Sequence, residues 1–321
     1  MLAPNNVIIF IKISIMNKLW CVMVFVLGSM GISVSQGIDI QAHRGGMALY
    51  PENTIIAMLN AMDWGVNTLE MDLSISRDKQ VVVSHEQVMD HRYVTTPCGK
   101  SFTKAEEKNY KLYNMPYDSI TKYDTGIKGD PRFPQRKKVQ AHKPLLSDLI
   151  DETEAYARIN NMPLPYYNIE IKSTKKNDNV YAPDYKEFTD LALGVLLQKN
   201  ITDRLVIQCF DTRTLNYIHE RYPQIRLSYL VGKQMVSFED AMSELKFVPE
   251  ILSPDYTIVN KQLVKAVHKK GMKILPWTVD SPEDIRKMVD LKVDGFITNY
   301  PDRAVKLIRF SKKYKKYYMN Q

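Results

Sequence analysis

Short apolar runs alternate with amphipathic segments along most of the chain beyond residue 38. The apolar runs predict strands at Asp39–Ala42, Asn67–Ser76, Val81–Val83, Tyr166–Lys172, Leu205–Cys209, Arg226–Leu230, Ile251–Ser253, Lys273–Trp277 and Asp294–Thr298. The segments between them predict helices. One begins after an Asn53 N-cap, one runs from a Ser147 cap to about Asn160, and one follows Pro301. The others are predicted at Asp184–Lys199, Thr212–Arg221, Lys261–Lys270 and Pro282–Leu291. Strands that alternate with helices indicate a parallel sheet, and about eight repeats indicate an α/β fold of the closed (β/α)8 TIM-barrel type.

One long segment interrupts this alternation. Residues 86–143 are polar and irregular, with many prolines and glycines, and they lie between the second and third barrel strands. A long stretch of this kind inside a compact domain is usually functional or disordered. Within it, Lys128–Val139 is basic; it either meets an anionic group of a ligand or is a solvated loop. The chain is therefore divided into a targeting segment (1–35) and a barrel (36–321) with an insertion (86–143).

Acidic side chains and histidines gather around the first strands. Glu70 and Asp72 are two residues apart on a strand, so their side chains point to the same face. A solvated face is the usual explanation of such a pair, but this strand is predicted to be covered on both sides. A hard divalent cation such as Ca²⁺ or Mg²⁺, which takes oxygen ligands, accounts for two converging buried carboxylates. His43 and His85 fall at neighbouring strand ends, and Glu170 and Lys172 repeat the two-residue spacing on the third strand.

The stretch from Gln41 to Glu86 resembles the signature of the glycerophosphodiester phosphodiesterase family. The matching pieces, in the same order and spacing, are HRGG, PENT and LEMDLSISRDKQVVVSHE. One departure is Glu86, where the family usually has aspartate; the charge is kept, and we expect activity to survive. The resemblance implies that Glu70, Asp72 and Glu170 hold one divalent cation, Ca²⁺ or Mg²⁺, and that Lys172 faces the phosphate. It also implies that the insertion folds over the mouth of the barrel and influences substrate choice.

Two further residues are candidates for the wall of the pocket. Trp277 resembles a family position at which an aromatic ring lines the pocket, although a buried core tryptophan is an equal alternative. Gln208 is a candidate pocket amide. In addition, Glu52 is expected to orient a neighbouring group by hydrogen bonding, the alternative being support of the helix N-terminus.

The expected reaction is metal-dependent hydrolysis of a glycerophosphodiester to glycerol 3-phosphate and an alcohol. His43 and His85 are expected to act as a general acid–base pair, because imidazole titrates near neutral pH. Arg44, with Lys172, is expected to bind phosphoryl oxygens, which the planar guanidinium fits well. One alternative is cleavage of an intact lysophospholipid with formation of a cyclic phosphate. Another is a non-catalytic phosphodiester-binding protein on a degenerate barrel.

The net charge of +8 belongs to the ends of the chain. Residues 1–35 carry two lysines, and seven lysines and arginines follow Asp302, so the remaining body from 36 to 302 has a net charge of −1. This distribution gives no support for nucleic-acid binding, and no protein partner is indicated. The basic C-terminal tail is either a peripheral contact with anionic lipid or polysaccharide, or a solvated helix end.

The N-terminus predicts an exported protein, periplasmic or extracellular. From Met16, a basic residue (Lys18), an apolar run from Leu19 to Met30 and the small residues Ser33–Ser35 indicate a signal peptide cleaved before Gln36. An uncleaved N-terminal membrane anchor is the alternative. Cys98 and Cys209 remain after cleavage, and nothing in their spacing argues that they pair.

Overall fold

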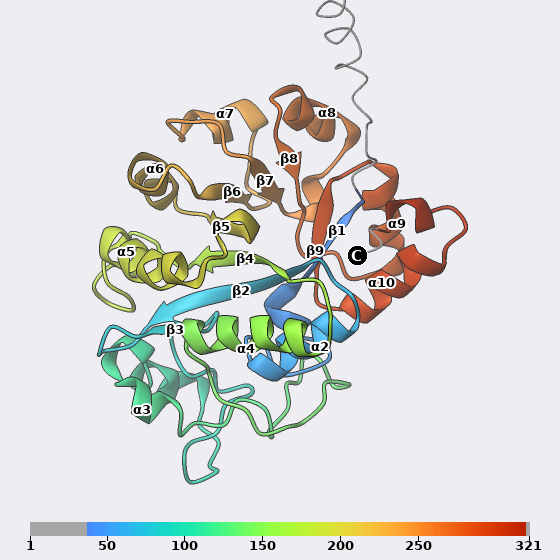
Figure 1. Ribbon diagram of the computed structural model, residues 1–321. Coiled ribbons are helices and arrows are strands. Elements are labelled where there is room, and N and C mark those ends of the chain that lie inside the picture. Colours follow the sequence, from blue (N-terminus) through green and yellow to red (C-terminus); the bar gives the residue numbers. More distant parts are fainter. Residues whose placement is uncertain (1–36, 319–321) are drawn as a thin grey trace, which may run out of the picture. The chain divides into compact units, whose positions relative to one another are not determined.

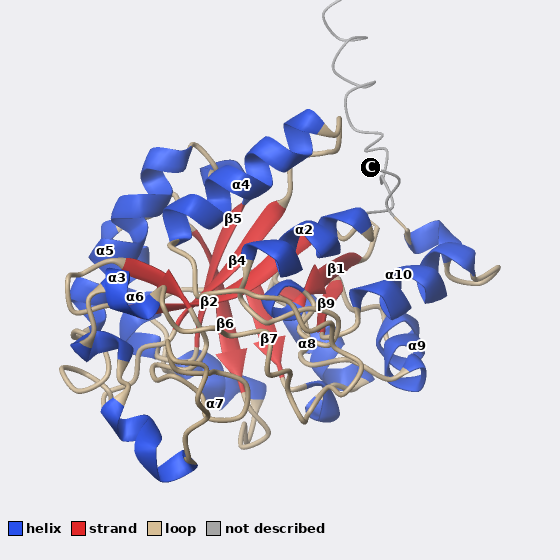
Figure 2. Ribbon diagram, turned by 90° about the horizontal axis from the view of Figure 1, so that it is seen from below, coloured by secondary structure: helices blue, strands red, loops and turns tan. Residues whose placement is uncertain are grey.

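The computed structural model describes residues 37–318, and these form a (β/α)8 barrel. Nine strands make one sheet, in which eight neighbours follow the order β8-β7-β6-β5-β4-β2-β1-β9. Figure 1 shows the strands gathered at the centre with the helices outside them, and Figure 2 shows the same layers at right angles. The strands are β1 (Asp39–Ala42), β2 (Thr68–Ile75), β3 (Val81–Val83), β4 (Tyr166–Ile171), β5 (Leu205–Cys209), β6 (Arg226–Val231), β7 (Ile251–Pro254), β8 (Lys273–Ile274) and β9 (Gly295–Thr298).

Backbone hydrogen bonds close the ring between its two ends. The N–H of Ile297 in β9 donates to the carbonyl of Pro276 at 2.9 Å, and the N–H of Val279 donates to the carbonyl of Ile297 at 2.9 Å. The strand predicted at Lys273–Trp277 is shorter than expected, because Pro276 has no N–H to donate to a ladder. The predicted TIM barrel is confirmed.

Helices cover the outside of the strands in the predicted order. They are α2 (Ile55–Asp63), α4 (Leu146–Ile159), α5 (Tyr185–Leu196), α6 (Thr212–Arg221), α7 (Phe238–Ser243), α8 (Lys261–Lys269), α9 (Pro282–Asp290) and α10 (Pro301–Phe310), while the short α3 (Tyr117–Ile120) belongs to the insertion. The helix α7 was not expected from the sequence. No helix in residues 37–318 has both the length and the apolar character needed to cross a membrane.

Two predicted helix caps are wrong. The N-cap of α2 is Thr54, whose hydroxyl accepts from the N–H of Ala57. Asn53 instead has a φ of 57°, and its side-chain amide donates to the carboxylate of Asp72. At α4 the N-cap position is Leu145, and Ser147 lies inside the first turn with its hydroxyl bonded to Asp148. In both places the cap-like residue is close to the helix start; at α2 a tertiary contact holds Asn53, and at α4 the hydroxyl of Ser147 bonds to its neighbour.

The interior of the barrel is polar where the site lies. All eight residues of β2 are buried; Leu69, Met71 and Leu73 belong to the main hydrophobic core, and the alternate residues Glu70 and Asp72 face the other way. The parallel register sets Asp72 opposite Glu170 of β4, and Glu170 opposite Gln208 of β5. Inward polar side chains from neighbouring strands therefore lie at one level of the barrel.

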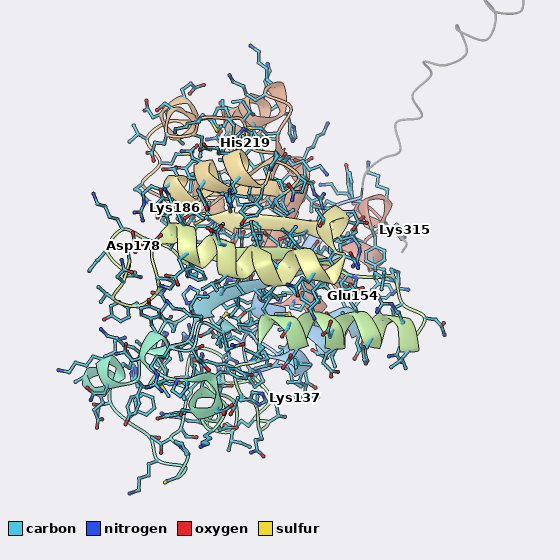
Figure 3. The ribbon with its side chains drawn as sticks, turned by 60° about the vertical axis from the view of Figure 1, so that its left-hand side comes forward. Lys137, Glu154, Asp178, Lys186, His219 and Lys315 are labelled. Carbon is cyan, nitrogen blue, oxygen red and sulfur yellow. The ribbon has the colours of Figure 1, made fainter. Side chains whose placement is uncertain are left out.

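The insertion is more ordered than its composition suggests. After β3, which pairs antiparallel with β2, the chain forms two 3-10 helices at Lys104–Asn109 and Leu112–Asn114 and then α3. These surround a small hydrophobic cluster of Val82, Met89, Tyr93, Val94, Phe102, Leu112 and Ile120. Figure 1 shows this segment beside β3 and α4. Lys137, labelled in Figure 3, lies where the segment returns to the barrel, and its N–H donates to the carbonyl of Leu49 at 2.9 Å.

Candidate active site

A tight turn after β1 carries the first histidine and arginine. Arg44, Gly45 and Gly46 have φ values of 50°, 79° and 84°, so the backbone is left-handed at three successive residues. At Gly45 a Cβ atom would lie 2.9 Å from Ala57 of α2, so glycine is required both by φ and by the close approach of the helix. The turn brings the Arg44 N–H to the Glu70 carboxylate at 2.8 Å and buries the guanidinium.

Three buried carboxylates converge beside this turn. Glu70, Asp72 and Glu170 each offer an oxygen within 4.8 Å of the others, and their exposed fractions are 1%, 1% and 7%. Burial, together with the charge of Asp72, raises the pKa of Glu70 well above its usual value. Burial also raises the pKa of Glu170, although Lys172 opposes this shift.

The donor set fits a hard divalent cation. The buried Oδ1 of Asp72 has no hydrogen-bond partner, while its Oδ2 accepts from the Asn53 amide at 2.9 Å. Burial would raise the pKa of Asp72, but Arg44 holds it well below its usual value, so this carboxylate is charged. A buried, charged carboxylate with an oxygen that lacks a hydrogen bond, close to two other carboxylates, is a set of oxygen ligands that suits Ca²⁺ or Mg²⁺. These three residues could therefore hold such an ion.

Glu52 lies behind Arg44 and binds it from the side of the insertion. Its Oε1 accepts from Arg44 Nη1 at 2.9 Å, and its Oε2 accepts from Arg132 Nη2 at 2.9 Å, with Arg136 Nη2 at 3.6 Å. Burial would raise the pKa of Glu52, but Arg44 and then Arg132 lower it to about 2. The structure thus places Glu52 where it orients Arg44.

Arg132 and Arg136 were missed as site residues, although their basic stretch was noted in the sequence. Arg136 is buried, its side chain 1% exposed, and Asp130 lies 3.3 Å from its Nη1. These two arginines of the insertion bind a carboxylate of the barrel. The alternative that Lys128–Val139 is a purely solvated loop is therefore wrong at these two arginines.

The two histidines differ in their partners. Nδ1 of His43 lies 2.6 Å from the Oδ1 of Asn299, whose amide group donates to Asp280 at 2.6 Å. The Asn299 oxygen can only accept, so Nδ1 of His43 carries the proton and Nε2 keeps a free lone pair. Burial, then the neighbouring Arg44, lowers the pKa of His43 to about 3, so this imidazole is neutral.

His85, by contrast, is paired with a carboxylate. Its Nδ1 lies 2.9 Å from Oε1 of Glu86, the residue that departs from the family pattern. The hydrogen bond from His85 lowers the pKa of Glu86 to about 2. Glutamate at this position therefore reaches the histidine that precedes it. Asn299 and Asp280 were not predicted, because nothing local in the sequence links them to His43.

A cavity of about 150 Å³ connects these groups. Seven of the nine predicted site residues line it: His43, Arg44, Glu70, His85, Glu170, Lys172 and Trp277, together with Gln208. Lys172 Nζ lies 3.0 Å from Glu170 and 3.8 Å from Asp72. The Trp277 indole donates to the carbonyl of Ser253 at 2.8 Å and meets Phe210 edge to face, so it is a pocket wall as well as a packed residue. Glu52 and Asp72 are absent from this lining, and each is bonded to Arg44, which lines it.

A second acidic cluster lies in the insertion, away from this cavity. Asp90, His91 and Glu107 also bring potential ligand atoms within 4.8 Å. However, Arg92 binds Asp90, Lys104 Nζ lies 2.6 Å from Glu107, and His91 Nδ1 lies 2.6 Å from the same carboxylate. Its acidic oxygens are therefore neutralised by side chains, and the cluster is a salt-bridge network. The cysteines Cys98 and Cys209 are both free.

Comparison with known proteins agrees with this geometry. The model of the glycerophosphoryl diester phosphodiesterase family matches residues 43–303. This chain belongs to that family. It is therefore an enzyme of the phosphoric diester hydrolase class, as the sequence predicted.

Relatives align over most of their own length. A glycerophosphodiester phosphodiesterase of Caldanaerobacter subterraneus is 28% identical over 268 residues, covering 84% of this chain and 96% of the relative. A human lysophospholipase D is 24% identical, covering 82% of this chain and 83% of the relative. A solved structure from Silicibacter pomeroyi, assigned to the same family, has a TM-score of 0.75 and 26% identity, covering 85% of this chain and 93% of that one.

Replacing Glu52 by glutamine should destabilise the protein in a pH-dependent way. Because the folded pKa of Glu52 is depressed to about 2, its contribution is fully present above about pH 4.5 and is lost as the pH falls towards 2. We expect Glu52→Gln to lower the free energy of unfolding by about 3 kcal/mol at pH 7 and by much less near pH 2. Urea unfolding across this range measures it. Glu187→Gln, at an exposed ion pair with Lys79, should cost below about 1 kcal/mol, and equal losses in both variants would contradict the prediction.

Proposed function

We propose that the protein hydrolyses glycerophosphodiesters to glycerol 3-phosphate and an alcohol, with Ca²⁺ or Mg²⁺ held by Glu70, Asp72 and Glu170. The observation that carries the proposal is the cluster of three buried carboxylates, two of which line one cavity together with Arg44, Lys172 and the two histidines. When bound, the cation would supply charge stabilisation at the phosphoryl oxygens and acidify a water molecule.

Arg44 and Lys172 bind the phosphate in this proposal. Both line the cavity, and both are fixed by carboxylates: Glu52 holds Nη1 of Arg44, and Glu170 holds Nζ of Lys172. Burial opposes the charged form of each side chain, but the adjacent carboxylates raise the pKa of both, so both cations are present at neutral pH. Prepositioned cations stabilise the charge that develops on the phosphoryl oxygens without reorganising during the reaction.

The partners of the histidines favour one division of roles. We propose His43 as the general base, because its imidazole is neutral and its Nε2 lone pair is free. His85 is then the general acid, because the Glu86 carboxylate bonded to its Nδ1 fixes the ring and leaves Nε2 to donate a proton to the leaving alcohol.

Export and membrane contact remain proposals of their own. We propose that the chain is exported by its N-terminal segment, which lies outside the described residues. The C-terminal tail is proposed to contact anionic lipid peripherally. Phe310, at the end of α10, is 75% exposed, and Lys312, Lys313, Lys315 and Lys316 follow it, a combination suited to an anionic surface.

Release of glycerol 3-phosphate from glycerophosphocholine tests the proposed reaction. The purified protein would be assayed with added Ca²⁺, with Mg²⁺ and with EDTA. We expect release that EDTA abolishes and that one of the two cations restores. Release that is unaffected by EDTA would contradict the metal assignment. A cyclic phosphate as the product would show that the reaction is internal attack within the substrate and not hydrolysis.

A further inference from the structure

A second cavity adjoins the active site at the mouth of the barrel. It has a volume of about 340 Å³ and is formed by the ends of β5 and β6, the loop after β6, and α7. Phe210 and Leu230 line both this cavity and the catalytic one. The two cavities therefore share part of a wall, and the second lies next to the one in which Arg44 and Lys172 are proposed to bind the phosphate.

The walls of the second cavity combine apolar and aromatic surface with negative charge. Phe210, which is 39% exposed, and Tyr229 supply rings, and Leu230, Met235 and Val236 supply aliphatic surface. Asp240 of α7 and Glu244, which follows it, are the charged residues of the lining, and no lysine or arginine is among them. Neither carboxylate forms an ion pair with a side chain in residues 37–318. The catalytic cavity, in contrast, contains the cations Arg44 and Lys172.

We propose that this second cavity binds the cationic alcohol portion of the substrate, an ammonium or quaternary ammonium group joined to the phosphate. The inference rests on the proposed function and adds the class of diester that the site prefers. Aromatic faces attract organic cations through their quadrupole, and carboxylates at the same wall add a direct charge interaction. A zwitterionic diester thus places its phosphate among cations and its ammonium among anions.

Other occupants fit the lining less well. An acyl chain would pack against Phe210 and the aliphatic residues but would leave the exposed Asp240 and Glu244 carboxylates without a cationic partner. A neutral polyol would form hydrogen bonds with the carboxylates but would gain little from Phe210 and the aliphatic residues. Charge complementarity and the wall shared with the catalytic cavity both favour the cationic group.

The double variant Asp240→Asn/Glu244→Gln tests this assignment. The measurement is kcat/KM for glycerophosphocholine and for glycerophosphoglycerol, whose alcohol is neutral. We expect the ratio of the two values, choline over glycerol substrate, to fall about fivefold, because one exposed ion pair contributes at most about that factor. The change should lie in KM. Glu239→Gln is the matched control, since Glu239 is an exposed acid of the same helix outside the lining, and its ratio should equal that of the unaltered protein.

Three outcomes would overturn the proposal. An unchanged ratio in the double variant, with both substrates still hydrolysed, removes the carboxylates from head-group recognition. An equal fall in the Glu239→Gln control shows a long-range charge effect instead of a binding site. Faster cleavage of lysophosphatidylcholine than of glycerophosphocholine, insensitive to the double variant, assigns the cavity to an acyl chain. Failure to cleave any of these diesters would refute the proposed function itself, which is a different result.

Direct binding of the cation alone gives an independent measurement. Choline chloride should inhibit hydrolysis of glycerophosphoglycerol competitively, and the double variant should weaken this inhibition about fivefold. Sodium chloride at the same ionic strength controls for screening. Equal inhibition by the two salts would overturn the assignment.

Discussion

Asp72→Asn is expected to lower kcat/KM for a glycerophosphodiester by about 100- to 1,000-fold and to remove the stabilisation of the fold by Ca²⁺ or Mg²⁺. Asp72 is the buried carboxylate that keeps one oxygen without a hydrogen-bond partner, and Arg44 keeps its pKa low. Asparagine preserves the shape and can still bond to Asn53, but it removes the negative charge that a divalent cation needs.

The melting temperature measured against cation concentration separates this effect from damage to the fold. A cation bound to the native state stabilises it by about 2.7 kcal/mol at one hundred times its Kd, and the variant should show none of this gain. Glu107→Gln is the matched control, because Glu107 belongs to the other acidic cluster, where Lys104 and His91 already satisfy it. That variant should keep the full response to the cation. A loss of response in Glu107→Gln but not in Asp72→Asn would move the metal site to the insertion.

His43→Ala and His85→Ala should each lower kcat by about 100- to 10,000-fold, the range of general acid–base catalysis. The two variants should differ with an activated substrate. A p-nitrophenyl phosphodiester of glycerol releases an alcohol that needs no protonation, so the variant lacking the general acid should recover most of its loss. We expect this recovery in His85→Ala and not in His43→Ala, because Glu86 orients His85 as the proton donor while His43 is neutral.

A third histidine provides the control for the pair. His219, labelled in Figure 3, lies on α6 and stacks on Phe247 with 4.1 Å between ring centroids, outside both cavities. His219→Ala should keep kcat on both substrates. Recovery in His43→Ala alone would exchange the two roles, and unchanged kcat in both site variants would refute the acid–base pair.

Much of the barrel and of its chemistry is encoded locally. The two-residue period of a strand is enough to place Glu70 with Asp72 and Glu170 with Lys172, and the register of β2 against β4 then sets Asp72 opposite Glu170. The strand–helix alternation predicts that strand ends meet at one edge of the barrel, and this is enough to group His43 with the carboxylates. These features depend on intervals of a few residues, and a sequence displays such intervals directly.

Contacts between the insertion and the barrel were decided by tertiary structure. Arg132 reaches Glu52 across 80 residues of chain, and Asn299 reaches His43 across 256. The same holds for α2, where Asn53 leaves the cap position to Thr54 and binds Asp72 instead. The second cavity likewise depends on α7 and the loop before it, which carry no strong periodic signal.

By itself, the sequence determined the strand order, the helices other than α7 and the short α3, the family and nine candidate site residues. Only the tertiary structure decided which side chains hold Arg44 and His43 in place, and that a wall with acidic side chains adjoins the catalytic cavity. The physical reason is that hydrophobic periodicity reports how each segment faces the core, whereas hydrogen bonds between distant segments depend on the path of irregular loops, which no local period records.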